Sequence, residues 1–227
     1  MIRGLFVTGT DTGVGKTVFC ALLLRALRQT RRAVGMKPVA AGLADGESVN
    51  ADVRSLIAAG NVDAPLGDVN PYSFAPPIAP ELAARAAGLA IDLDVIAAAY
   101  SRLAARADAV IVEGAGGALV PLTRRTDMLD IACRIDVPVL LVVGIRLGCL
   151  NHALLSALAV DARGLRLAGW VANRIDPTMR EGDANVAALV DRLPVPLLAD
   201  VAWNGTTTPL PRCEELLRQI GFAAGSA

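Results

Sequence analysis

A glycine-rich segment close to the amino end has the residue types of a phosphate-binding loop. Residues 9–17 read Gly-Thr-Asp-Thr-Gly-Val-Gly-Lys-Thr, between a short apolar run and a segment of helical character. In such a loop, glycines let backbone N–H groups approach phosphate oxygens, Lys16 reaches the β- and γ-phosphates, and the Thr17 hydroxyl binds Mg²⁺. A tight turn would account for the glycines but not for Gly15 followed by lysine and threonine. The segment therefore predicts nucleotide binding, although Thr10 stands where the common motif has glycine.

Asp11 narrows the class of phosphate-loop protein. ATPases that partition chromosomes or place division sites carry a second lysine early in the loop, at the position that Asp11 takes here. A switch-type ATPase acting on a protein partner is therefore the weaker alternative. An enzyme that uses ATP is the favoured interpretation.

Three ionisable side chains outside the loop are placed to act on a bound nucleotide. Lys37 follows the apolar run 33–36, and Glu113 follows the run 109–112, which resembles a Walker B strand. In an open parallel sheet, ligands bind beside the carboxyl ends of the strands, so both side chains are expected near the loop. Lys37 is either solvated or buried beside an anion, for which a phosphate or carbamate is the better account. Asp52 is either a second Mg²⁺ ligand or a carboxylate favoured by a helix dipole.

Two further segments are candidates for lining the site. Residues 114–117 read Gly-Ala-Gly-Gly, and three glycines in four positions indicate a close backbone approach or positive φ angles. Residues 70–80 contain four prolines among Asn-Pro-Tyr-Ser-Phe-Ala-Pro-Pro-Ile-Ala-Pro and are expected to form a rigid loop, neither a helix nor an inner strand. That loop is either a surface connection or a wall of the substrate site.

Composition excludes several functional classes. Lysine plus arginine number 22 and aspartate plus glutamate number 22, so no basic surface for nucleic acid is expected. The longest apolar stretches, 18–24 and 137–143, are far shorter than the roughly 20 residues that a membrane-spanning helix needs. Four cysteines and one histidine form no metal-binding pattern and favour reduced thiols in the cytoplasm.

Short apolar runs alternate with longer alanine- and leucine-rich segments along the chain. Because the runs are apolar throughout, they predict strands that helices cover on both faces. The chain is therefore expected to form one α/β domain over residues 1–227, with a doubly wound, mostly parallel sheet of the P-loop NTPase type. The expected strands are 5–8, 33–36, 109–112, 137–143, 167–172 and 197–201, and the expected helices are 16–29, 50–59, 80–87, 93–105, 128–134, 151–161 and 184–192.

Six motifs taken together resemble the dethiobiotin synthetase family. They occur in the family's order between residue 8 and about residue 203, and so span nearly the whole chain. The motifs are residues 9–17, Lys-Pro-Val at 37–39, Asn-Pro-Tyr at 70–72, Glu-Gly-Ala-Gly-Gly at 113–117, Leu-Gly-Cys-Leu-Asn-His at 147–152 and Gly-Trp-Val-Ala-Asn at 169–173.

The resemblance implies an ATP-dependent ring closure as the reaction. In this family 7,8-diaminopelargonate captures CO₂ as a carbamate, ATP phosphorylates the carbamate, and the second amine closes the ureido ring with loss of phosphate. The products are dethiobiotin, ADP and phosphate. Because charge accumulates between carbamate and γ-phosphate, positioning and cations matter more than acid–base catalysis.

The resemblance also implies a role for each residue that matches a family motif. Lys16 and Lys37 are the implied catalytic cations, and Thr17, Asp52 and Glu113 are the implied Mg²⁺ ligands. The implied ATP site comprises Thr12, Gly13, Val14, Gly15, Lys16, Thr17, Val18, Asp52, Glu113, Gly114, Ala115, Gly116, Asn173, Arg174, Ala202, Trp203 and Asn204. The implied substrate site comprises Asp11, Lys37, Ala41, Gly148, Cys149, Leu150 and Asn151.

The same resemblance implies a homodimer, and Ala41 departs from the family pattern. The turn at 147–151 is expected to hold the distant carboxylate of the substrate across a two-fold interface, with a helix beginning near Asn151. Where the family often has serine or threonine, Ala41 has no hydroxyl, which affects the fit of the diamine. A related amidotransferase-linked ligase that acts on a corrin acid is disfavoured, because the chain has no glutaminase half.

Overall fold

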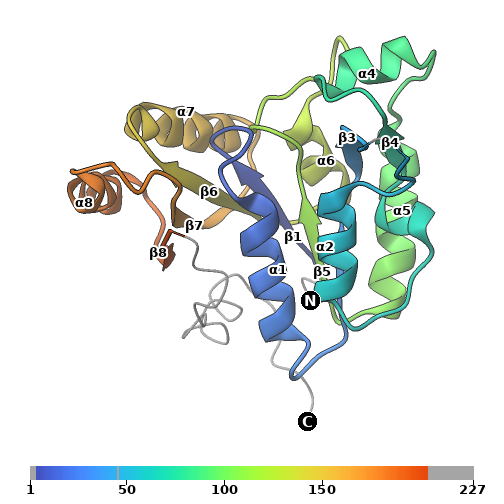
Figure 1. Ribbon diagram of the computed structural model, residues 1–227, viewed down its shortest axis with the longest axis horizontal. Helices are drawn as coiled ribbons and strands as arrows, with labels where there is room; N and C mark the ends of the chain where they lie inside the picture. Colours follow the sequence, from blue (N-terminus) through green and yellow to red (C-terminus); the bar gives the residue numbers. More distant parts are fainter. Residues whose placement is uncertain (1–3, 45, 204–227) are drawn as a thin grey trace.

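A six-stranded sheet forms the centre of the protein (Figure 1). The computed structural model describes residues 4–44 and 46–203. All neighbouring strands of this sheet pair in parallel, in the order β2-β5-β1-β6-β7-β8. The strands are β1 (Gly4–Gly9), β2 (Ala33–Met36), β5 (Ala109–Glu113), β6 (Val139–Ile145), β7 (Leu167–Arg174) and β8 (Leu197–Val201). The predicted doubly wound α/β fold is confirmed, and strand β1 with its phosphate loop lies at the middle of the sheet.

Helices cover the two faces of the sheet, because alternate side chains of each strand point to opposite sides. Leu5 and Val7 of β1 join the apolar cluster beneath the first pair of helices, whereas Phe6 joins the cluster on the other face. The first face carries α1 (Lys16–Leu27) and α2 (Ala51–Ala59). The second face carries α5 (Leu93–Arg106), α6 (Met128–Ile135), α7 (Cys149–Ala162) and α8 (Gly182–Arg192).

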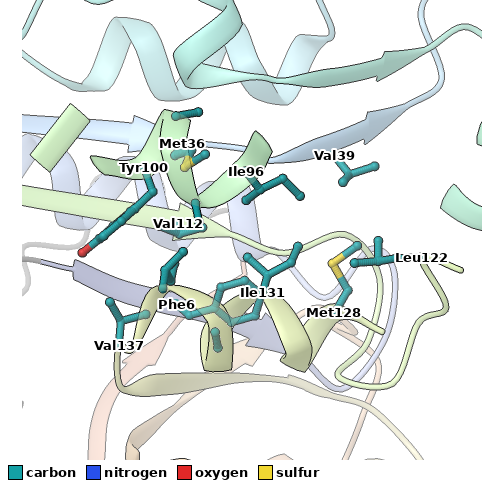
Figure 2. Packing of buried hydrophobic residues seen from close by; sticks show 14 of the residues in the cluster. Phe6, Met36, Val39, Ile96, Tyr100, Val112, Leu122, Met128, Ile131 and Val137 are labelled. Atoms are coloured by element: carbon teal, nitrogen blue, oxygen red, sulfur yellow. The ribbon is translucent and has the colours of Figure 1, made fainter. Parts of the chain in front are cut away.

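Figure 2 shows the packing on the second face. Phe6 of β1 and Val112 of β5 pack in one cluster with Ile96 of α5 and Ile131 of α6. All four are 1% exposed or less, and burial of each such side chain contributes about 1.5–3 kcal/mol. This packing fixes the direction of β1 and β5, whose carboxyl ends deliver the phosphate loop and Glu113.

A second, two-stranded sheet was not predicted. Strand β3 (Val39–Ala41) pairs in parallel with β4 (Tyr72–Phe74), so the expectation of a loop over 70–80 is wrong at residues 72–74. Proline is tolerated here because Pro71 and Pro76 lie outside the paired residues. Two short helices accompany this sheet, the unpredicted α3 (Leu66–Val69) and the predicted α4 (Pro80–Ala86).

Within residues 4–44 and 46–203, no helix has the length and apolar character needed to cross a membrane.

Candidate active site

The phosphate loop joins β1 to α1 in a conformation that requires glycine. Gly13 and Gly15 have φ angles of 74° and 87°, and helix α1 begins at Lys16 without a side-chain cap. A Cβ atom at Gly15 would lie 2.0 Å from Nδ2 of Asn173, so the position excludes a side chain for steric reasons as well. The N–H groups of the first turn of α1 are therefore available to an anion.

Asn173, at the end of β7, lies directly against this loop. Its Nδ2 atom donates to the carbonyl oxygen of Val14 at 2.8 Å, and the residue is 8% exposed. The structure thus brings Asn173, a predicted ATP-site residue, into contact with the predicted phosphate loop.

Lys16 lies within the loop and is largely buried. Its Nζ atom donates to the carbonyl oxygen of Asp11 at 2.8 Å. Burial lowers the pKa of Lys16 to about 8, and the charge of Glu113 offsets part of that effect. A negative ligand beside the ammonium would stabilise its protonated form.

The Lys37 ammonium lies between two carboxylates. Its Nζ atom donates to Asp52 Oδ2 and to Glu113 Oε1, each at 2.6 Å. Lys37 is 5% exposed and Glu113 is 1% exposed, whereas the Asp52 side chain is 44% exposed. Burial by itself would lower the pKa of Lys37, but the charges of Glu113 and Asp52 outweigh it and raise that pKa. Of the two alternatives for Lys37, the structure supports burial over a solvated side chain, and the anions beside it are side-chain carboxylates. A phosphate or carbamate partner stays a prediction.

The three predicted Mg²⁺ ligands converge on the same point. Thr17 Oγ1 donates to Glu113 Oε1 at 2.7 Å. Burial raises the pKa of Asp52, but Lys37 and the Thr17 hydroxyl lower it by more. Glu113 Oε2 is buried and has no hydrogen-bond partner among the described residues. A hydroxyl and two carboxylates are the hard oxygen donors that Mg²⁺ prefers, so these residues fit the ion.

That donor set is small, which also fits Mg²⁺. The described part of the chain contains no cluster of three or more histidine, cysteine, aspartate or glutamate side chains for a metal. Mg²⁺ differs from zinc in this respect, because it usually retains several waters and takes its remaining ligands from substrate phosphates.

The glycine-rich segment after Glu113 passes close to the phosphate loop. Gly116 has a φ angle of 64°, and a Cβ atom there would lie 3.4 Å from Thr12 Oγ1. A Cβ atom at Gly117 would lie 3.6 Å from the carbonyl oxygen of Gly9. The predicted close backbone approach is confirmed, and its partner is the loop itself. Gly114 is buried and Ala115 is partly buried beside it.

The turn before α7 lies on the other side of the loop. Gly148 has a φ angle of 94° and precedes α7, which begins at Cys149, two residues earlier than predicted. Cys149 is buried, Leu150 is partly buried and Asn151 is exposed. Arg146 forms an ion pair with Asp11 and so connects this turn to the phosphate loop.

Sequence reasoning assigned no role to Arg146 or to two buried asparagines. Asn70 donates from Nδ2 to the carbonyl oxygens of Lys37 and Tyr72, at 2.6 and 2.9 Å. Asn50 caps α2. Two features of the sequence could have pointed to two of them. Arg146 directly follows the strand that ends at Ile145, and Asn70 belongs to the Asn-Pro-Tyr motif.

The remaining predicted ATP-site residues lie on α1, on β7 and after β8. Arg174 is held by ion pairs with Asp183 and Asp200, at 2.6 and 2.7 Å, whose hydrogen bonds raise its pKa. Ala202 is exposed and Trp203 is half exposed. Val18 is 39% exposed on the first turn of α1. Asn204 lies outside the described residues.

A cavity of about 570 Å³ lies elsewhere, at the amino edge of the sheet. It is lined by residues of α7 and by the segments that precede β7 and β8, and it contains none of the predicted site residues. The candidate site is therefore not this cavity. It is the cluster of Lys16, Lys37, Asp52 and Glu113 at the carboxyl edge of the sheet, called here the carboxyl-edge cluster.

The parallel sheet, the glycine loop and the buried Lys37–Glu113 pair define a P-loop protein that uses a nucleoside triphosphate. Solved structures with a similar fold include the septum site-determining protein MinD with Mg-ADP from Pyrococcus horikoshii (TM-score 0.55, 20% identity, covering 97% of this chain and 87% of that one). A ParA-family ATPase from Chlorobium tepidum has a TM-score of 0.54 and 12% identity, covering 96% and 92% of the two chains. At these identities the likeness shows the fold alone.

The sequence comparisons identify the family. A family model described as an AAA domain matches residues 3–210. The ATP-dependent dethiobiotin synthetase BioD of Nitrosospira multiformis is 55% identical, covering 90% of each chain. That of Aromatoleum aromaticum is 52% identical, covering 88% of this chain and 90% of its own. The chain belongs to the ATP-dependent dethiobiotin synthetase family, as the motifs indicated.

Proposed function

We propose that this protein makes dethiobiotin, ADP and phosphate from 7,8-diaminopelargonate, CO₂ and ATP. The intermediates are a carbamate and a carbamic-phosphoric anhydride, formed in that order. The observation that carries the proposal is the carboxyl-edge cluster of Lys16, Lys37, Asp52 and Glu113, in a chain 55% identical to a curated synthetase over 90% of its length. The reaction is a step of biotin synthesis, and the chain is a ligase that forms C–N bonds.

Two lysines supply positive charge to the transferring phosphoryl group in this proposal. Lys16 and the N–H groups that start α1 hold the β- and γ-phosphates, because both face the same loop. Lys37 is held 2.6 Å from Asp52 and from Glu113, and its Nζ atom stabilises charge between carbamate and γ-phosphate. A charge held in place by buried partners needs little reorganisation when the reaction occurs.

Thr17, Asp52 and Glu113 would hold Mg²⁺. These residues would place a divalent positive charge beside the phosphates, which would neutralise part of their negative charge. The buried Oε2 atom of Glu113 supports this assignment, because a buried carboxylate oxygen without a hydrogen-bond partner is costly unless a ligand satisfies it.

The other residues are proposed to bind the two ends of the substrates. Thr12, Gly13, Val14, Gly15, Val18, Gly114, Ala115 and Gly116 surround the phosphates, and Asn173, Arg174, Ala202, Trp203 and Asn204 lie on the adenine side. Asp11, Ala41, Gly148, Cys149, Leu150 and Asn151 contact the diamine and its carboxylate. A cytoplasmic location is proposed as well, which the three free cysteines of the described residues support.

We also propose that the active unit is a homodimer. Helix α7 and the turn before it, which is expected to hold the substrate carboxylate, expose large apolar side chains. Leu147 is 93% exposed, and Leu155 and Leu158 are 57% and 64% exposed. A two-fold interface on this face would cover these side chains and place the turn beside the partner's site.

Subunit mixing tests the shared site. A Lys16→Ala chain and a Gly148→Pro chain are each expected to be inactive, because proline cannot adopt the φ angle of 94° at Gly148. A mixed dimer contains one site with an intact loop and an intact turn, so activity should return on mixing. Confirmed exchange without recovered activity would contradict the shared site.

The decisive experiment for the reaction measures phosphate release by the purified protein. Release is expected only when ATP, diaminopelargonate and bicarbonate are all present, and the organic product should have the mass of dethiobiotin. Release that ignores the diamine would instead support the switch-type ATPase. The structural neighbours of that type share the fold alone, and the sequence relatives reported above are synthetases.

A further inference from the structure

A buried asparagine connects the metal-binding carboxylate to the segment expected to contact the diamine. Asn50 is 7% exposed and precedes α2. Its Oδ1 atom accepts a hydrogen bond from the backbone N–H of Asp52 at 2.9 Å. Its Nδ2 atom donates to the carbonyl oxygen of Gly42 at 2.9 Å and to that of Ala41 at 3.4 Å. Asn50 thus contacts both parts of the site through the two ends of one amide.

Capping α2 does not by itself require asparagine. Serine, aspartate and asparagine are about equally good at the N-cap, because each offers an oxygen to the first turn. The two carbonyl oxygens accept hydrogen bonds from Nδ2, whereas aspartate has no donor and the single hydroxyl of serine can donate to only one of them. Asparagine is therefore suited both to capping α2 and to binding the backbone at Ala41 and Gly42.

That segment is fixed on its other side by the proline-rich loop. The N–H of Gly42 donates to the carbonyl oxygen of Phe74 at 3.0 Å, and a Cβ atom at Gly42 would lie 3.2 Å from Pro77. Gly42 has a φ angle of 85°, so the chain turns sharply here. Movement of this turn away from Asn50 would shift Ala41 relative to Asp52 and Lys37.

We propose that Asn50 is a positioning residue that fixes the diamine-binding segment at Ala41–Gly42 relative to the phosphoryl-transfer cluster at Asp52. This inference rests on the proposed function. It assigns part of the affinity for the diamine to a side chain that touches neither substrate. Ala41 has no side-chain hydroxyl to offer the diamine, so its contribution depends on where its backbone lies. Asn50 fixes that backbone position.

The test separates the two ends of the amide. Asn50→Asp keeps the oxygen that caps α2 and replaces the donor with a second oxygen facing two carbonyls. Loss of these hydrogen bonds is expected to raise the KM for the diamine and its Kd by about tenfold, on the scale of one buried hydrogen bond. The KM for ATP at saturating Mg²⁺ should stay within twofold or so, because the cap and Asp52 are retained.

The matched control is Asn61→Asp. Asn61 accepts from the N–H of Ala33 and donates to the carbonyl oxygens of Arg28 and Arg31, at the opposite edge of the sheet. Its substitution should change the midpoint of thermal unfolding and leave every kinetic constant unchanged. Asn50→Ser provides the uncharged comparison if the aspartate variant does not accumulate as folded protein.

Calorimetric titration of diaminopelargonate without ATP or Mg²⁺ gives a readout besides turnover. Weaker binding by Asn50→Asp, with wild-type binding by Asn61→Asp, supports the positioning role. Unchanged diamine affinity and KM in a folded Asn50 variant would overturn it, as would equal changes in both variants. A wild-type protein that neither binds the diamine nor releases phosphate with it would refute the proposed function, which is a separate result.

Discussion

Replacing Lys37 with methionine tests the buried charge cluster most directly. The change keeps most of the side-chain volume and leaves the carboxylate of Glu113, 1% exposed, without its ammonium partner at 2.6 Å. Removing one partner of a buried pair costs about 3–5 kcal/mol. The low end applies here, because Asp52 is 44% exposed and solvent screens its share.

A loss of about 3 kcal/mol should lower the unfolding midpoint by roughly 6–12 °C in a chain of this size. The midpoint is measured in chelator by differential scanning calorimetry. Adding Glu113→Gln to Lys37→Met removes the unpaired charge, so the double variant should recover part of the midpoint. Turnover should be about 10²-fold lower or worse in both, because neither supplies the cation.

The control is Arg32→Met, which breaks an ion pair with Asp108 at 2.8 Å on the surface. Its effect on the midpoint should be much smaller, since exposed pairs contribute little. Unfolding of Lys37→Met at the wild-type temperature would contradict a stabilising buried pair. A further loss of stability on adding Glu113→Gln would contradict it as well. Full turnover at saturating ATP in Lys37→Met would remove this lysine from the chemistry.

Five other substitutions have defined outcomes. Lys16→Ala should lower turnover about 10²-fold, and near-normal phosphate release would contradict the loop assignment. Because burial lowers the pKa of Lys16 to about 8 from 10.5, the unfolded chain binds more protons between these pH values and stability rises with pH there. In the wild-type protein this rise in the free energy of unfolding amounts to at most about 3 kcal/mol between pH 8 and pH 10.5. Lys16→Met should lack it, which urea unfolding at these two pH values would measure. Asp52→Asn and Glu113→Gln should each require more Mg²⁺ for half-maximal rate, and an unchanged requirement in both would exclude them as ligands. Gly15→Ala should weaken nucleotide binding measured by calorimetry, since its Cβ would lie 2.0 Å from Nδ2 of Asn173; wild-type affinity would show that the loop adapts.

The elements that could be predicted from the sequence are those that a local pattern of residues identifies. The main strands are apolar on both faces, so they are visible as runs in the sequence. Strand β6 pairs on both sides, and its seven residues Val139–Ile145 are all buried. By contrast, β3 and β4 have three residues each, and their pairing depends on a contact between Pro38 and Tyr72 that no local pattern predicts.

In the candidate site, too, some residues are identified by local motifs and others only by tertiary contacts. Lys16, Thr17 and Glu113 are recognisable because their motifs carry the chemistry in a fixed order along the chain. The contact of Lys37 with Asp52 is a tertiary contact, because Lys37 follows β2 and Asp52 lies in the first turn of α2. Arg146 was missed for this reason, since its partner Asp11 lies in another loop.

The central position of β1 has a consequence for how the chain is synthesised. Gly4 pairs with Val110 and Phe6 with Val139, so the first strand has neither neighbour until roughly a hundred or more further residues have been made. Until then the loop that follows β1 has no sheet edge to hold it, and α1 lacks the cluster on which it packs. A ribosome-bound fragment that ends before β6 should therefore fail to retain ATP, and apolar residues of β1 should be open to chaperones during that interval. The affinity for nucleotide should appear abruptly with nascent-chain length, once β6 has emerged from the exit tunnel.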